Sequence, residues 1–137
     1  MILLASVVNA GFGVFLIVLA AVEFVRPDIF ERFIRLFASS ARAHYTEQTC
    51  RLLIGASIIM LAPATWNALL FRVVGWMIFG SALGLILLPW RWHWRFGTWV
   101  MPKFLRYIKL YAIGLFAFGI FLLSGVFHAG LSGRVTN

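Results

Sequence analysis

The sequence predicts an all-α polytopic membrane protein with four transmembrane helices and one amphipathic helix at the membrane surface. Hydrophobic residues make up 63% of its 137 residues and charged residues only 12%, about half of the share in soluble domains. Four apolar segments approach the roughly 20 residues that cross a bilayer core about 30 Å thick. Most of the charged residues lie between these segments.

The four predicted spans lie at about residues 2–25, 49–66, 69–88 and 104–127, and together they form a single transmembrane domain over residues 1–137. Only Asn9 and Glu23 interrupt the first span, whereas the second is shorter and ends near Pro63. No basic residue precedes the first apolar run, so we expect a retained helix and not a signal peptide.

The one sizeable connection runs from Arg26 to Gln48, and within it residues 27–39 carry apolar and charged residues at helical spacing. Pro27 suits the first turn of a helix, where its missing N–H costs nothing. We expect this helix to lie in the headgroup plane, with Arg32 and Arg35 on its charged face. Packing of the apolar face on protein is an alternative of equal weight.

The segment Leu88 to Lys109, here called the aromatic belt, is rich in tryptophan and basic residues. Indole rings favour the headgroup level, and arginine heads reach lipid phosphates while their stems lie along apolar surface. Trp and basic residues alternate over residues 89–94, and residues i and i+2 do not share a helix face. An extended conformation is therefore an alternative for residues 89–94, and it would leave one row of side chains for a partner or cofactor. The predicted lipid and interface residues are Arg32, Arg35, Trp90, Arg91, Trp92, Trp94, Arg95 and Trp99.

Orientation follows from the distribution of Lys and Arg. Ten of the twelve lie in or beside the first and third connections, and only Arg72 and Arg134 lie on the opposite side. The positive-inside rule then places both basic connections in the cytoplasm and both termini outside it, in a bacterial inner membrane. The net charge of +8 indicates anionic lipids as partners, and not nucleic acid, because the cations flank apolar spans.

A weak internal repeat is also visible. In each copy a helix ends at a proline beside a basic segment, and the chain returns through a basic residue into a glycine-bearing helix. The first copy is residues 20–55, with Pro27 and Gly55, and the second is residues 84–114, with Pro89 and Gly114. This predicts a duplicated helical hairpin.

Few residues in the spans could carry chemistry. Glu23 is the only acidic residue within an apolar span, so it is the candidate proton or ion group, although an ion pair with Arg26 three residues later is favoured. His93 and His128 are weak candidates for binding haem or pigment. No His, Cys, Asp or Glu pair has metal-ligand spacing, and no catalytic or nucleotide motif indicates an enzyme or a cofactor.

Small residues are frequent in the spans, where they let helix backbones approach closely. The predicted helix-packing residues are Gly13, Gly55, Gly75, Gly80, Gly84, Gly114 and Gly119. Packing within the four-helix bundle and association with other membrane proteins, including further copies of the chain, have equal weight at this point.

Three functions follow as hypotheses. The leading one is a non-catalytic accessory subunit that organises or stabilises a larger bacterial membrane complex, such as a respiratory or photosynthetic one, through helix packing and lipid contacts. The second is a small homo-oligomeric transporter or channel in which Glu23 titrates. The third is a membrane subunit that binds pigment or haem, and an absorbance spectrum distinguishes it.

Overall fold

The structure is a computed structural model that describes residues 1–37 and 40–135, without the side chains of residues 37, 93, 101–105 and 133–135. The described residues form helices joined by short turns, and no strand occurs among them. The elements are α1 (Ile2–Val25), α2 (Pro27–Phe37), α3 (Ala41–Leu61), the 3₁₀ turn η1 (Ala62–Ala64), α4 (Ala68–Leu87), α5 (Trp90–Arg106) and α6 (Ile108–Val135).

Three of the described helices are long and apolar enough to cross a membrane: α1, α4 and the part of α6 from Ile108 to Ser132. The chain is therefore membrane-embedded in character, as its composition predicts. α3 is not among the three, because its first half carries Arg42, His44, Glu47 and Arg51. The second predicted span, residues 49–66, covers the more apolar second half of α3 together with η1.

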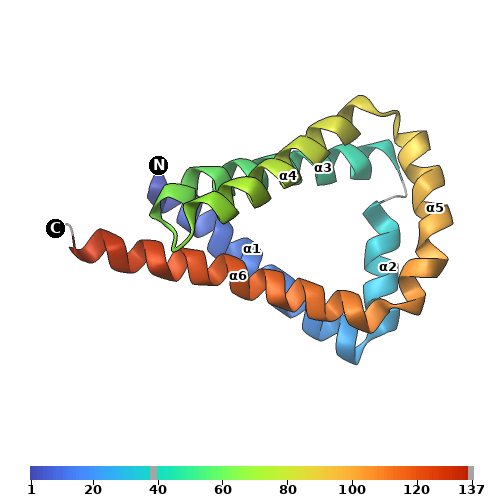
Figure 1. The fold of residues 1–137 in the computed structure, drawn as a ribbon. Helices are drawn as coiled ribbons and strands as arrows, with labels where there is room; N and C mark the ends of the chain where they lie inside the picture. The colour runs from blue at the N-terminus through green and yellow to red at the C-terminus, as the bar shows by residue number, and fades with distance from the viewer. Residues whose placement is uncertain (38–39, 136–137) are drawn as a thin grey trace.

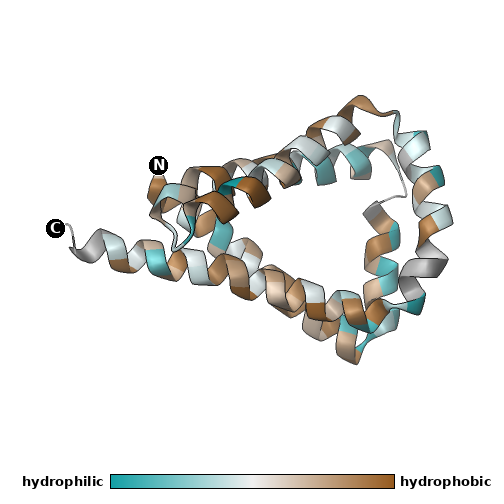
Figure 2. Cartoon of the chain, in the orientation of Figure 1, coloured by the Kyte–Doolittle hydropathy of each residue, from teal (hydrophilic) through white to brown (hydrophobic). Residues whose placement is uncertain are grey.

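The long helices pack as two pairs, α1 with α6 and α3 with α4. The two pairs lie together near the chain termini and the α3–α4 turn, and they diverge toward the opposite end, where α2 and α5 run across (Figure 1). Colouring by hydropathy places much of the hydrophilic sequence on α2, the first half of α3 and α5 (Figure 2). The molecule thus has one polar end, made by the two short helices and the start of α3.

The core lies where the two pairs meet. Leu16 of α1, Ile58 of α3, Phe71 of α4 and Leu122 of α6 are buried there in one cluster. The ring of Phe71 stacks on Phe121, with 4.2 Å between the ring centroids. Contacts of this density fix the position of one pair on the other at this end of the molecule.

The two halves of the chain repeat the order long helix, short helix, long helix. The same number of residues separates Gly13 from Gly75, Ala20 from Ala82 and Pro27 from Pro89, and the first two of these matches are buried on both helices. The layout agrees with the predicted duplication. Its details differ, because Gly119 and not Gly114 occupies the position on α6 that Gly55 occupies on α3.

Helix bounds differ most from the predicted ones at the starts of α3, α5 and α6. α3 begins at Ala41, eight residues before the predicted span, because Ser40 caps it by accepting a hydrogen bond from the Ala43 N–H at 3.2 Å. The predicted extended alternative for residues 89–94 is wrong from residue 90 onward, because α5 begins at Trp90. α6 begins at Ile108 and not at 104, and residues 38–39 of the predicted surface helix lie outside the described residues.

Candidate functional site

In each helix pair, the two helices cross in contact at a pair of glycines, one on each helix. A Cβ atom added at Gly119 would lie 2.7 Å from the carbonyl oxygen of Gly13, and one added at Gly55 would lie 3.0 Å from that of Gly75. Backbone atoms occupy the space that a larger side chain would need, so these four predicted packing glycines serve contacts within the chain.

Gly80 and Gly84 of α4 lie on a face that no other described helix covers. No atom of another helix lies within 4 Å of the position that a Cβ atom would take at either residue, and the same holds for Gly114 of α6. Gly80 and Gly84 are one turn apart, so they share a face, and Trp76, Met77 and Leu87 flank them with more than half of their surface exposed. The result is a small-residue strip between large apolar side chains on the outside of the α3–α4 pair.

Buried polar side chains lie on the inner faces of α1 and α3. Asn9 is fully buried and donates hydrogen bonds to the Ala5 carbonyl oxygen at 2.8 Å and to the Ser57 hydroxyl at 3.2 Å. His44 lies with its Nε2 atom 3.2 Å from the Leu85 carbonyl oxygen of α4. Side-chain hydrogen bonds therefore connect α3 to α1 and to α4.

Glu23 differs from these groups because neither of its carboxyl oxygens has a hydrogen-bond partner, although only 2% of its surface is exposed. The predicted ion pair with Arg26 is wrong. Arg26 ends α1 with φ −135° and ψ 68° and pairs instead with Asp28, with 3.2 Å between Arg26 Nε and Asp28 Oδ1. Arg26 still donates its N–H to the Val22 carbonyl oxygen as the C-cap of α1, but its guanidinium turns to Asp28 in the first turn of α2.

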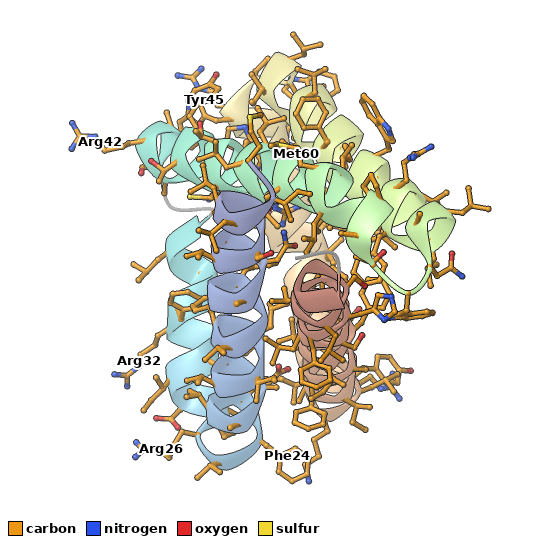
Figure 3. All side chains as sticks on the ribbon, turned by 90° about the vertical axis from the view of Figure 1, so that its left-hand side faces the viewer. Phe24, Arg26, Arg32, Arg42, Tyr45 and Met60 are labelled. Atoms are coloured by element: carbon orange, nitrogen blue, oxygen red, sulfur yellow. The ribbon has the colours of Figure 1, made fainter. Side chains whose placement is uncertain are left out.

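Charges on the polar end are largely neutralised within α2 and α3. Arg35 contacts Glu31 at 2.6 Å and Arg51 contacts Glu47 at 2.6 Å. The hydrogen bond from Arg26 lowers the pKa of Asp28 and raises that of the guanidinium. Arg26, Arg32 and Arg42 project outward from the molecule in the view of Figure 3.

The candidates for metal and cofactor binding are dispersed. Among the described residues, no group of three or more His, Cys, Asp or Glu side chains could hold a metal ion. His128 lies on an exposed face of α6, and the side chain of His93 lies outside the described residues. Cys50 is an exposed free thiol on α3.

The aromatic belt forms α5, so its alternating tryptophans and arginines do not point in opposite directions. Arg91 and Arg95 are one helical turn apart and share an exposed face. Together with neighbouring rings they line an open hollow of about 870 Å³, whose residues are Trp90, Arg91, Trp92, Trp94, Arg95, Phe96 and Trp99. Six of the eight predicted lipid and interface residues therefore lie in one place.

Sequence reasoning missed the burial of Gln48, whose side-chain amide atoms have no hydrogen-bond partner, and the tie between Trp66 and Ser124. Trp66 donates from Nε1 to the Ser124 hydroxyl at 3.0 Å across the two pairs. Neither feature had a signal in the sequence, because both depend on which helices pack together, and spacing along one helix does not indicate its partner.

No family model, no curated protein and no solved structure matches this chain.

Proposed function

We propose that this protein is a non-catalytic accessory subunit of a larger bacterial membrane complex, such as a respiratory or photosynthetic one. The observation that carries the proposal is the uncovered Gly80–Gly84 face of α4. Four glycines form the two helix crossings inside the chain, whereas this pair has no partner among the described helices. In a bilayer, such a strip favours a close approach by another membrane helix.

The proposal includes a membrane arrangement. α1, α3, α4 and α6 cross the bacterial inner membrane, and α2 and α5 lie in its cytoplasmic headgroup layer, with both termini on the other side. Support comes from the position of α2 and α5 at one end of the molecule and of both termini at the other (Figure 1). Ten of the twelve Lys and Arg residues belong to the sequence at or beside the polar end.

Substitution of the uncovered glycines tests this function. We expect the wild-type chain, extracted from its native membrane in mild detergent, to migrate on a native gel within a large assembly. Gly80→Ile and Gly84→Ile should release it as a free chain, because a branched side chain keeps a facing helix at a distance.

The matched control is Gly11→Ile, since Gly11 of α1 is also uncovered but has no second glycine one turn away. This variant should stay in the assembly. Migration of the wild-type chain only as a monomer or small homo-oligomer contradicts the proposed function.

A second candidate function is a small homo-oligomeric transporter or channel with Glu23 as the titrating group. Its specific support is the burial of an unpartnered carboxyl group in α1. In that case, proteoliposomes loaded with a pH-sensitive dye should show proton flux that Glu23→Gln abolishes. Flux that is absent in the wild type, or unchanged in the variant, sinks this alternative.

A further inference from the structure

The hollow on α5 has an arginine pair at its centre and aromatic rings on both sides. On a helix, Arg91 and Arg95 fall on one face, Trp90 and Trp94 on one flank of it, and Trp92, Phe96 and Trp99 on the other. Trp92 and Trp99 keep 71% and 64% of their surface exposed. The rings therefore flank the two guanidinium groups, and the hollow between them is open to its surroundings.

The described part of the chain does not balance the charge of this arginine pair. The sequence has four acidic residues, and α5 has none of them. Asp28, Glu31 and Glu47 pair with Arg26, Arg35 and Arg51, and Glu23 is buried in α1. Among the described residues, no carboxylate is therefore within ion-pair distance of Arg91 or Arg95.

The contrast with α2 shows that this is a local property of α5. Both short helices run across the same end of the molecule (Figure 1). In α2, Glu31 lies one turn before Arg35 and forms an ion pair with it at 2.6 Å. In α5, the residue one turn before Arg95 is a second arginine, Arg91. Two adjacent guanidinium forks without a carboxylate complement a phosphate, whose oxygens accept paired N–H donors.

We propose that the Arg91–Arg95 hollow of α5 binds the phosphate of an anionic phospholipid. The flanking tryptophans suit the headgroup level, where an amphipathic ring contacts both glycerol and water. Leu87 and Leu88, at the junction of α4 and α5, are exposed and offer apolar surface for the acyl chains. This inference rests on the membrane arrangement in the proposed function but not on the association of α4 with a partner.

The test measures binding of phosphatidylglycerol to the full chain in detergent by native mass spectrometry. Arg91→Gln/Arg95→Gln should weaken binding by about tenfold or more, since each arginine near an anionic surface contributes on the order of a fivefold gain in affinity. Arg91→Lys/Arg95→Lys should fall between this variant and the wild type, because it keeps the charge and loses the fork.

The matched control is Arg42→Gln/Arg72→Gln, which removes the same charge from exposed sites on α3 and α4. It should leave the affinity close to that of the wild type. Equal weakening by both double variants means diffuse attraction and overturns the site. Wild-type binding of phosphatidylcholine as strong as that of phosphatidylglycerol overturns the preference for an anionic lipid.

Inorganic phosphate serves as the competitor that separates a lipid from a free ion. If it displaces phosphatidylglycerol at a similar concentration, the ligand is the phosphate group alone and the lipid proposal fails. Gly80→Ile should bind phosphatidylglycerol like the wild type. Failure of the complex to form and failure of the lipid site are therefore separate results.

Discussion

Replacing Gly119 with leucine is expected to lower the free energy of unfolding by about 3 kcal/mol or more, at the upper end of overpacking effects. The reason is that its Cβ atom would lie 2.7 Å from the Gly13 carbonyl oxygen and 2.7 Å from Ile17 Cγ1 on α1. A side chain can rotate away from a clash, but a backbone oxygen moves only if the whole helix shifts. The α1–α6 pair must therefore separate.

The measurement is equilibrium unfolding in mixed detergent micelles, followed by helical circular dichroism. Gly114→Leu is the control on the same helix, because nothing lies within 4 Å of its Cβ position. It should change the free energy of unfolding by no more than about 0.5 kcal/mol, as exposed substitutions usually do. Equal losses for both variants would show that the glycine crossing does not hold the pair together.

Replacing Glu23 with leucine is expected to raise the free energy of unfolding by about 1–3 kcal/mol, the usual cost of a buried polar group without a partner. Both oxygens lack a hydrogen bond, and the equivalent position in the second half of the chain, by the spacing of Pro27 and Pro89, is Leu85. A leucine therefore already occupies this position in the other pair. A residue that reduces stability and yet is present is a candidate for function.

Thermal unfolding in detergent checks this expectation, with Glu31→Gln as the control carboxylate. Glu31 forms a surface ion pair with Arg35 on α2, so its loss should lower the free energy of unfolding by less than about 1 kcal/mol. A loss of stability in Glu23→Leu would mean that the carboxyl group has a stabilising partner, and the transporter alternative would lose its support.

The sequence predicted the bounds of a helix well where the length of its apolar segment alone decides them. The predicted span at residues 2–25 coincides with α1, and that at residues 69–88 differs from α4 by one residue at each end. Hydropathy failed at α3, since Ala41 to Gln48 is too polar for a span but forms a capped helix. The pattern also misled at α5, because alternation of Trp and Arg is typical of an extended chain. In the helix that forms instead, Arg91 and Arg95 are one turn apart and therefore lie on one face.

The pairing of helices could not be predicted in the same way. A glycine permits a close approach, but its spacing along one helix does not say which other helix approaches it. The sequence therefore left Gly55 and Gly80 equivalent, whereas Gly55 contacts α4 and Gly80 contacts no described helix. The predicted pairing of Glu23 with Arg26 failed for a local reason, since Pro27 begins a new helix and Asp28 in its first turn pairs with the Arg26 guanidinium.

The contact between α1 and α6 joins the first and last helices, and this sets an order on biosynthesis. α3 and α4 are adjacent in the chain, so the Gly55–Gly75 crossing can form as soon as α4 is made. Gly13 has to wait until α6 is made, because Gly119 is its partner. Until then, one face of α1 stays uncovered and exposes the surface that α6 later buries.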